Sequence, residues 1–314
     1  GKSDEVNILK EMNYPHSLGL LYSAFTYYCG FKVNGGEYKL MGLSPYGEPT
    51  YADLIKSELV SIASDGSITL NMEYFRYHES LSMFDHKLEN LLEAPRRKLD
   101  SKITQHTCNV AKSIQVVTEE IMLKMATHAH DLTGAENLCL AGGVALNCVA
   151  NGKLQSSRIF KEIWIQPAAG DAGASYGAAL ELYLRKFRKV RSKYSKIETA
   201  NSNYYLGPSY NKDEIKSCLD SHDYKYEELH SEERAQRVAS LIAKDLVVGH
   251  FSGRCEFGPR ALGSRSILGD PRSKNAQSVL NLKIKYRESF RPFAPAVIEE
   301  DIKEYFDLKT TSPY

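Results

Sequence analysis

The feature that most constrains the fold is a strand, loop and helix pattern that occurs twice between residues 137 and 187. The apolar run Asn137 to Leu140 is followed by the turn AGGVALN and a helical stretch to about Leu154. The run Ile163 to Gln166 is followed by the turn PAAGDAGA and a helix from about Ser175 to Phe187. Strands joined by a crossover helix are parallel, so both loops are expected at the carboxyl edge of one sheet. The pattern predicts an α/β fold with one crevice beside both loops.

The length of 314 residues favours two globular units, because one hydrophobic core rarely supports so long a chain. In the first unit, apolar residues at three- and four-residue spacing predict an amphipathic helix from about Asn109 to Leu132, ending at Gly134. The polar segment 190–203 has almost nothing able to enter a core. We therefore expect domains at residues 1–200 and 204–314.

In the second unit, the sequence predicts a helix from about Glu232 to Ala243 and a strand from Val247 to Phe251. The arginine-rich run follows this strand directly. Its glycines and prolines indicate backbone shaped tightly between strands, and disfavour a long helix.

Composition excludes several classes of protein. The 40 basic and 39 acidic residues give a net charge of +1, so no field of the whole molecule attracts nucleic acid or a membrane. The six cysteines form no C-x-x-C pair, which argues against a zinc ribbon and against a redox dithiol. No apolar stretch reaches the ~20 residues of a membrane span and no secretory signal is visible, so we expect a cytoplasmic protein.

The run from Gly253 to Pro295 is the strongest candidate for a binding site. Between positions 254 and 291 it contains six arginines and three lysines against only Glu256, Asp270 and Glu288. Guanidinium groups suit phosphate and carboxylate oxygens, and interleaved apolar residues favour a pocket over a solvated face. A nucleic-acid surface is the other alternative, disfavoured because the chain is neutral and the arginines do not share one helical face.

The two turns of the repeated pattern are further candidates. Gly142 and Gly143 precede a helix start, where free N–H groups hold a phosphate, and Asn147 could reach a ribose or phosphate oxygen. The same glycines could also serve only to turn the chain tightly. Asp171 is the one carboxylate near either turn, and it fits either a metal ligand or a helix N-cap.

Other stretches carry less signal. EYKLMGLSPYGEP is rich in turn formers and predicts a structured surface loop. His128 and His130 lie two apart on a helix, so they cannot chelate one metal and are expected at the surface. No nucleophilic triad is legible.

The chain resembles the NodU/CmcH type of O-carbamoyltransferase, a family that also includes aminoglycoside carbamoyltransferases. The matching motifs lie between about Tyr14 and Val297 and read YPHSLGLLYSAFTYYCGF, GEYKLMGLSPYG, LCLAGGVALNCVANGKL, QPAAGDAGASYGAAL, GRCEFGPRALGSRSILGDPR and IKYRESFRPFAPAV. The resemblance implies a fold class of α/β with an α+β second domain: a partial ASKHA-type, actin-like domain followed by a YrdC-like domain.

The resemblance also implies a reaction and its residues. The second domain would join carbamoyl phosphate and ATP into carbamoyladenylate, and the first would pass the carbamoyl group to a hydroxyl of a small molecule of sugar, nodulation-factor or antibiotic type. Carried over by motif, the catalytic residues that bind carbamoyl phosphate or the adenylate are Arg260, Lys285 and Arg291, and those nearby are Arg254, Arg265 and Arg287. Gly142, Gly143 and Asn147 would contact the nucleotide, and Asp171 would bind a metal.

The cofactors that this resemblance implies are ATP and a divalent metal ion, with Fe²⁺ as the leading candidate. The partners are carbamoyl phosphate, ATP and a hydroxylated small-molecule acceptor. A membrane is not expected and nucleic acid is disfavoured, whereas a homodimer is left open.

The sequence departs from the family at the metal site. The family's histidine pair has no counterpart, since no H-x-x-x-H occurs in the 314 residues. The family also continues past Tyr314 with further binding motifs. We therefore expect a fragment that lacks the first part of the ASKHA-like domain and the end of the second domain, and that is inactive alone. The alternatives are a non-catalytic, nucleotide-binding regulatory module and a transfer-RNA modification factor related to threonylcarbamoyl transfer.

Overall fold

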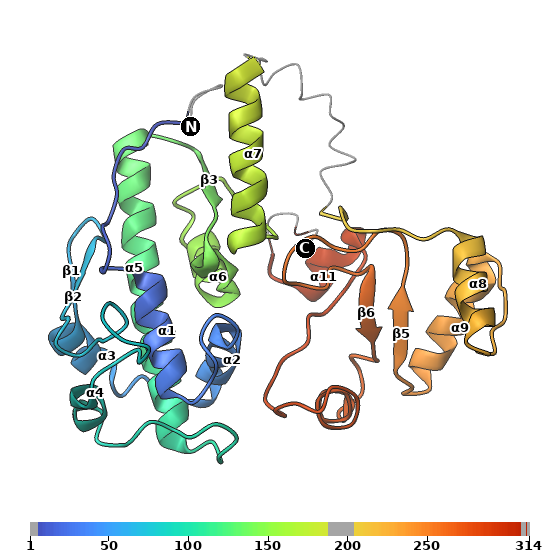
Figure 1. Cartoon of the computed structure of the whole chain (residues 1–314), viewed down its shortest axis with the longest axis horizontal. Coiled ribbons are helices and arrows are strands. Elements are labelled where there is room, and N and C mark those ends of the chain that lie inside the picture. Colours follow the sequence, from blue (N-terminus) through green and yellow to red (C-terminus); the bar gives the residue numbers. More distant parts are fainter. Residues whose placement is uncertain (1–5, 188–203, 309–311, 313–314) are drawn as a thin grey trace. The chain divides into compact units, whose positions relative to one another are not determined.

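The chain folds into two compact units. The computed structural model describes residues 6–187, 204–308 and 312. Contacts between residues divide the chain into a first unit, Gly1–Asp171, and a second unit, Ala172–Tyr314 (Figure 1). These units divide at residue 171, and the expected domains at residues 1–200 and 204–314 stay a prediction. The polar segment 190–203, where we expected the boundary, lies outside the described residues.

The first unit is mostly helical and contains two small sheets. Its longest helix, α5, is contacted by α1, α2 and α6 (Figure 1). In chain order its elements are α1 (Leu18–Tyr28), α2 (Glu37–Leu43), η1 (Ser44–Tyr46), α3 (Ala52–Leu54), η2 (Ile55–Leu59), β1 (Val60–Ile62), β2 (Ile68–Leu70), α4 (His86–Leu91), α5 (Gln105–Thr133), β3 (Asn137–Leu140), η3 (Gly143–Leu146), α6 (Cys148–Ser157) and β4 (Glu162–Ile165). The β1 and β2 strands pair antiparallel.

Helix α5 begins and ends where its sequence supplies caps. The Thr104 hydroxyl accepts a hydrogen bond from the Thr107 N–H at 3.3 Å, and Gly134 ends the helix with a φ of 60°. Ile114, Val117 and Ile121 on its inner face have no exposed surface. The amphipathic helix predicted over residues 109–132 is confirmed, and its buried stripe forms the centre of the first unit's core.

The strands β3 and β4 confirm the strand, loop and helix pattern that the sequence predicts between residues 137 and 187. They pair in parallel, with Asn137 opposite Glu162 and Leu140 opposite Ile165. The helix α6 connects them, as predicted. Because parallel strands point the same way, the loops after β3 and β4 leave the same edge of the sheet.

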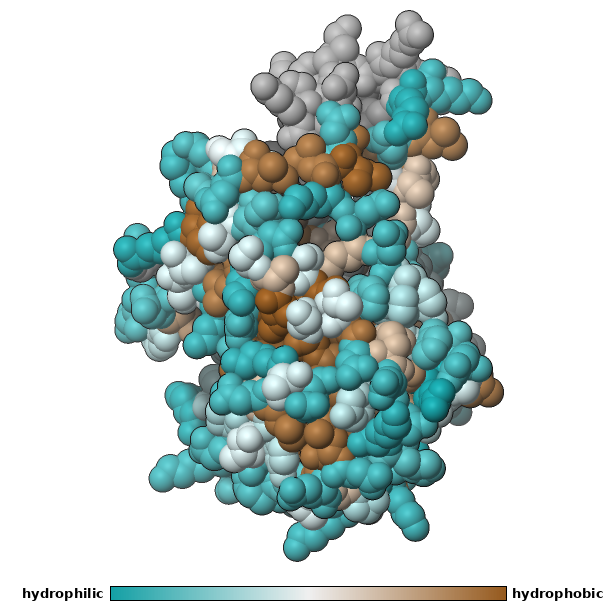
Figure 2. Space-filling model, turned by 90° about the vertical axis from the view of Figure 1, so that its left-hand side faces the viewer, coloured by the Kyte–Doolittle hydropathy of each residue, from teal (hydrophilic) through white to brown (hydrophobic). Residues whose placement is uncertain are grey.

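Some apolar side chains of the first unit remain on its surface. Large exposed examples near its start are Val6, Ile8, Leu9 and Met12. The space-filling view shows hydrophobic patches that interrupt a mostly hydrophilic face (Figure 2). Within the described residues, no helix combines the length and the apolar character needed to cross a lipid bilayer.

The second unit is built around a β-hairpin. Its strands pair antiparallel and lie side by side in Figure 1, with Val248 opposite Leu268 and Phe251 opposite Arg265. Its elements are α7 (Asp171–Phe187, starting at the last residue of the first unit), α8 (Lys212–Ser221), α9 (Ser231–Ala243), β5 (Val248–Phe251), β6 (Arg265–Leu268), α10 (Ala276–Ser278), η6 (Val279–Ile284), η7 (Glu299–Asp301) and α11 (Ile302–Tyr305). The predicted helix 232–243 and strand 247–251 are confirmed to within one residue.

Buried side chains of the second unit are few and mostly polar. The buried apolar ones among its described residues are Cys255 and Leu280, and the buried polar or charged ones are Glu256, Asp270, Asn281 and Arg291. Neither α8 nor α9 buries a residue. Among the described residues of this unit, buried polar or charged side chains therefore outnumber buried apolar ones.

Two stretches differ from the sequence prediction. The motif EYKLMGLSPYGEP forms the helix α2 and the turn η1, so the predicted loop is wrong. Burial of Leu40 and Leu43 orders this segment, and the Glu37 carboxylate accepts hydrogen bonds at its start from the Asn34 and Gly36 N–H groups. The helix α7 begins at Asp171, earlier than the predicted Ser175, because a negative charge and small residues favour a helix start.

Candidate functional site

The glycine-containing loops after β3 and β4 lie side by side. The Gly142 N–H donates to the Ala169 carbonyl at 2.8 Å and so joins the two loops. Gly142 has a φ of 99°, a conformation that favours glycine. A Cβ added at Gly142, Gly143 or Gly170 would meet nothing within 4 Å, so open space lies in front of the loop backbone. The prediction that the loops meet at one sheet edge is confirmed.

Asn147 ends the first loop, and its side chain is directed inward. The residue is 8% exposed, and its Oδ1 accepts the Ala150 N–H at 3.1 Å, which caps α6. The same amide exchanges two hydrogen bonds of 3.0 Å with the amide of Gln115 on α5. These bonds occupy the Asn147 side chain, and the Gly142 N–H is bound to Ala169, so the loop would offer a nucleotide its exposed backbone at Gly143.

Asp171 is exposed at the first position of α7. Its carboxylate lies at the positive end of the helix dipole, where a negative charge is favoured. Within residues 6–187, 204–308 and 312, no three His, Cys, Asp or Glu side chains are grouped so that they could hold a metal ion. The described residues therefore offer Asp171 as one ligand without companions, and the metal site stays a prediction.

Glu256 anchors the arginine-rich loop that connects β5 to β6. Its side chain has no exposed surface, and its Oε1 accepts the N–H groups of Leu262 at 3.0 Å and Arg265 at 2.9 Å. Burial acts to raise the pKa of Glu256, but the backbone N–H groups outweigh it and leave the pKa lowered. One buried carboxylate thus fixes the loop that carries Arg260, whose own side chain is partly buried.

The second carboxylate oxygen of Glu256 makes no hydrogen bond among the described residues. Its Oε2 has no hydrogen-bond partner within the described chain, and the Arg265 Nε lies 3.9 Å away. The Arg265 side chain is 59% exposed, so this ion pair is loose. Arg265 is free to turn its guanidinium group toward solvent or toward a bound anion.

Arg254 holds the base of the same loop. Its Nε donates to the Gly207 carbonyl at 2.9 Å and its Nη2 to the Leu206 carbonyl at 3.1 Å. Gly207 donates its own N–H to the Cys255 carbonyl, and a Cβ at Gly207 would lie 2.7 Å from the Cys255 Cβ. The close approach requires glycine at position 207. Arg254 therefore links the backbone at Leu206 and Gly207 to the start of its own loop.

A second cluster surrounds Asn281, which is fully buried. Its Nδ2 donates to the Arg291 carbonyl at 2.8 Å, and its Oδ1 accepts the Arg287 Nε at 2.7 Å. The Arg291 guanidinium, 7% exposed as a residue, binds the Glu288 carboxylate at 2.8 Å. Asn281 therefore brings Arg287 and Arg291 together, and the exposed Lys285 lies between Asn281 and Arg287 in sequence.

Arg272 has a partner of its own. Its Nε and Nη2 bind the two oxygens of Asp270 at 2.9 and 2.6 Å, and its backbone N–H binds the same carboxylate. These hydrogen bonds lower the pKa of Asp270 to about 2. Asp270 and Arg272 form a closed pair that stabilises the turn after β6.

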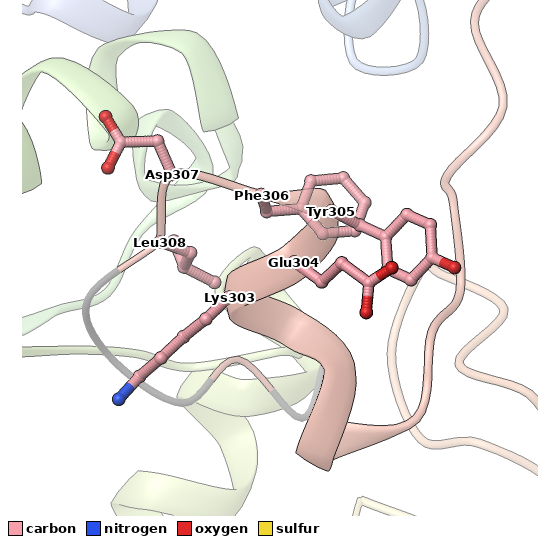
Figure 3. Close-up of a pocket in the computed structure, with 6 residues that line it drawn as sticks. All are labelled: Lys303, Glu304, Tyr305, Phe306, Asp307 and Leu308. Atoms are coloured by element: carbon pink, nitrogen blue, oxygen red, sulfur yellow. The ribbon is translucent and has the colours of Figure 1, made fainter.

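A shallow pocket of about 520 Å³ lies elsewhere in the second unit. Six consecutive residues line it, from Lys303 to Leu308, and Figure 3 shows their side chains pointing in different directions. None of them belongs to the arginine run. A hollow formed by one short segment offers no set of converging groups, so it is not a candidate site.

The structure thus divides the predicted residues among three local groups. Gly142, Gly143 and Asn147 share the glycine loop, Arg254, Arg260 and Arg265 share the Glu256 loop, and Arg287 and Arg291 share the Asn281 cluster. The packing of the Leu280 side chain, 3.1 Å from where a Gly269 Cβ would lie, connects the last two groups. Asp171 belongs to none of them.

Two residues that shape these groups were not identified as functional from sequence. Gln115 interrupts the apolar stripe of α5, and a fully buried glutamine there is a signal for a polar network. Glu256 was counted only as a charge. Its hydrogen bonds reach backbone groups six and nine residues away, and no spacing rule predicts them.

Two family models match the chain. One, described as carbamoyltransferase N-terminus, matches residues 1–180. The other, described as carbamoyltransferase C-terminus, matches residues 239–314. The first match contains the glycine loops, and the second contains the arginine run.

Several curated proteins are similar to the chain over most of its length. An uncharacterized protein of Synechocystis is 53% identical over 100% of this chain and 51% of its own length. The nodulation protein NolNO of Sinorhizobium fredii is 37% identical over 98% of this chain and 43% of its own length. The nodulation protein NolO of Bradyrhizobium diazoefficiens is 37% identical over 93% of this chain and 50% of its own length. The chain spans about half the length of the curated relatives it matches.

Proposed function

The chain belongs to the carbamoyltransferase family, and from this premise we propose that the protein is an O-carbamoyltransferase that works through carbamoyladenylate. It would form this intermediate from carbamoyl phosphate and ATP, and transfer the carbamoyl group to a hydroxyl of a small molecule. The observation that carries the proposal is the arginine-rich segment around Glu256 and Asn281, which lies inside the matched carbamoyltransferase C-terminus.

The atoms of the proposed reaction balance in three steps. Water displaces phosphate from carbamoyl phosphate and leaves carbamate. A carbamate oxygen attacks the α-phosphorus of ATP and pyrophosphate leaves, which gives carbamoyladenylate. The acceptor oxygen attacks the carbamoyl carbon, loses its proton, and AMP leaves. Both substrates and both leaving groups are anionic, so a cluster of fixed cations lowers the barrier in each of the first two steps.

The arginine segment supports these roles through its rigidity. Arg260 is held in a loop that Glu256 fixes by two backbone hydrogen bonds, and Arg291 is buried beside Glu288. Donors that are already oriented cost little reorganisation when negative charge develops. We assign Arg260, Lys285 and Arg291 to carbamoyl phosphate and the adenylate, with Arg254, Arg265 and Arg287 as neighbouring cations.

The glycine loop would bind the nucleotide part of the adenylate. Its backbone at Gly143 is exposed and faces open space, and it leads through the turn η3 into the helix α6. N–H groups of such loops bind phosphate oxygens. ATP is thus a proposed co-substrate. A divalent metal ion, with Fe²⁺ first, would need ligands beyond Asp171 that the described residues do not bring together.

The acceptor is a hydroxylated small molecule in this proposal. Relatives such as NolNO and NolO carry the name nodulation protein, so a nodulation factor is one proposed acceptor beside a sugar or an antibiotic. Other partners, including a second copy of the chain, stay predictions from the family resemblance.

Pyrophosphate release tests the proposal. The full-length protein is incubated with ATP and carbamoyl phosphate, and we expect pyrophosphate to appear only when both are present. Arg260→Ala should lower the rate about 100-fold or more, the effect of removing one fixed donor. Lys274→Ala, which removes an exposed cation of the same segment, should leave the rate within about twofold. Pyrophosphate release that ignores carbamoyl phosphate would sink the proposal, and nucleotide binding without release would favour the regulatory module.

A further inference from the structure

A buried network of side chains joins the core of the first unit to its glycine loop. Gln115, which has no exposed surface, lies at its centre on α5. Its Oε1 accepts hydrogen bonds from the Tyr22 hydroxyl at 2.9 Å and the Asn147 Nδ2 at 3.0 Å. Its Nε2 donates to the Asn147 Oδ1 and to the Glu119 carboxylate, both at 3.0 Å. Every hydrogen-bonding position of the Gln115 amide is therefore filled.

The partners fix which way each amide points. Glu119 presents a carboxylate and needs a donor, so the Gln115 Nε2 must face it. The Ala150 N–H needs an acceptor, so the Asn147 Oδ1 must face α6. Flipping either amide would place two donors or two acceptors together. A low-dielectric surrounding makes such a mismatch costly, so the network holds one arrangement.

This arrangement reaches the exposed loop through Asn147. The residue follows η3 directly, and its own N–H binds the Val144 carbonyl at 2.9 Å. Its Oδ1 caps the first turn of α6 through Ala150. The position of the Asn147 side chain therefore sets both the end of the glycine loop and the start of α6. None of these hydrogen bonds joins Tyr22 or Gln115 to Gly142 or Gly143. Within this network, both residues therefore reach the glycine loop through Asn147.

We propose that Gln115 is a positioning residue, which holds Asn147 so that the glycine-loop backbone at Gly143 stays oriented for a nucleotide phosphate. The inference rests on the proposed function, in which this loop binds the nucleotide. Gln115 itself touches no substrate. Its effect would be seen in nucleotide affinity and in the order of the loop, beyond any general loss of stability.

The test compares three variants of the whole chain. Gln115→Met keeps the length of the side chain and removes all four hydrogen bonds of its amide. Thr118→Val is the matched control, because Thr118 is equally buried on the same helix and binds only the Ile114 carbonyl, at 2.8 Å. Tyr22→Phe removes a single hydroxyl from the network, and serves if Gln115→Met fails to fold.

Two measurements are made on each variant. The first is hydrogen exchange at the Ala150 and Asn151 amides, corrected for the change in unfolding free energy. We expect exchange about tenfold faster in Gln115→Met, an intermediate rate in Tyr22→Phe, and no change in Thr118→Val. The second is the dissociation constant for ATP, which should rise about tenfold in Gln115→Met and stay within about twofold in Thr118→Val.

The outcomes separate the inference from the function beneath it. If the wild type does not bind ATP, the proposed nucleotide role of the loop fails, while the exchange data still decide whether Gln115 orders it. If the wild type binds ATP and Gln115→Met behaves like Thr118→Val in both measurements, the positioning role is overturned and Gln115 is a core residue only.

Discussion

The glycine loop of the first unit and the arginine loop of the second are fixed by different kinds of buried group. Neutral amides, Gln115 and Asn147, hold the glycine loop against a core of fully buried residues such as Ile114 and Ile121. A carboxylate, Glu256, holds the arginine loop in a unit with little buried apolar surface. The first loop is thus supported by packing and by hydrogen bonds between two amides, one of which also binds the Glu119 carboxylate, and the second by hydrogen bonds to a fully buried carboxylate.

The difference matches what each loop would bind. A backbone anion site needs only fixed geometry, which the hydrogen bonds between the Gln115 and Asn147 amides can supply without a charge next to the loop. An arginine site has to keep several like charges close together, and buried or half-buried acids offset their repulsion. Glu256, Asp270 and Glu288 serve this purpose beside Arg265, Arg272 and Arg291. Charged support has a cost, because removing one partner leaves an uncompensated group.

The largest change in unfolding free energy is expected from a core substitution in the first unit. Ile121→Ala removes a fully buried side chain from α5, and we expect the unfolding free energy to fall by about 3 kcal/mol or more. The one tryptophan, Trp164, lies in β4, so its fluorescence during urea denaturation reports on this unit. As a control, Leu282→Ala in the second unit removes a side chain that is 53% exposed and should cost below about 0.5 kcal/mol. A loss below about 1 kcal/mol for Ile121→Ala would contradict a packing-based first unit.

The second challenge removes the buried carboxylate. Glu256→Ala leaves the N–H groups of Leu262 and Arg265 without their acceptor, and two charge-assisted bonds amount to about 3 kcal/mol. Glu256→Gln keeps an acceptor at the same place and should cost less. Hydrogen exchange at the two amides checks both variants. If the two amides in Glu256→Ala keep their wild-type protection from hydrogen exchange, the Glu256 carboxylate is not what orders the loop.

The pH dependence of the second unit separates charged from neutral support. Arg272 keeps the pKa of Asp270 at about 2, below the ordinary value of about 3.9. Because this folded-state pKa is lowered, the pair stabilises the fold above about pH 4, and the contribution is lost as the pH falls toward 2. Arg272→Ala should raise the pKa of Asp270 in a carboxyl NMR titration. An unchanged titration would mean that Arg272 does not bind Asp270 in solution.

The Tyr22 hydroxyl is the corresponding group in the first unit. Burial raises its pKa well above the ordinary value for tyrosine, so it stays a donor to Gln115 over the same range of pH. Phenolate absorbance from Tyr22 in the folded protein near pH 10 would contradict a network in which Tyr22 is buried away from water.

The smallest effect is expected at Arg265. Its Nε lies 3.9 Å from Glu256 and its side chain is 59% exposed, so Arg265→Ala should change the unfolding free energy by less than about 0.5 kcal/mol. Chemical denaturation measures this. A larger loss would make the ion pair, more than the backbone hydrogen bonds, the support of the loop.

Regular patterns in the sequence predicted the backbone around the glycine loop well, and in the arginine-rich segment they predicted only the strand β5 that precedes it. Apolar runs bounded by glycine-rich turns gave β3 and β4 and their parallel pairing, and three- and four-residue spacing gave α5 with Gly134 at its end. The helix α2 was mistaken for a loop because its glycine and the following Ser-Pro favour turns, whereas burial of Leu40 and Leu43 decides the structure. Tertiary contacts overrode local propensity there.

Side-chain partners were harder to predict than elements. Asn147 was expected to reach a nucleotide, but its amide turns inward to Gln115, which lies 32 residues earlier in the chain. The arginine run was recognised from its charge, yet Glu256, Asp270, Asn281 and Glu288 determine where its guanidinium groups lie. Such pairings depend on the folded arrangement of segments, and periodicity does not encode them.

Amide chemical shifts during a titration with carbamoyl phosphate show which loop receives this ligand, and so test whether the arginine-rich segment binds it. In the wild-type chain we expect the shifts to change within residues 253–291, with Arg260 and its neighbours affected most, and to stay constant at residues 142–151. The changes should vanish in Arg260→Ala and persist in Lys274→Ala. Shifts confined to the glycine loop, or equal shifts in the wild type and Arg260→Ala, would contradict the assignment of carbamoyl phosphate to the arginine-rich segment.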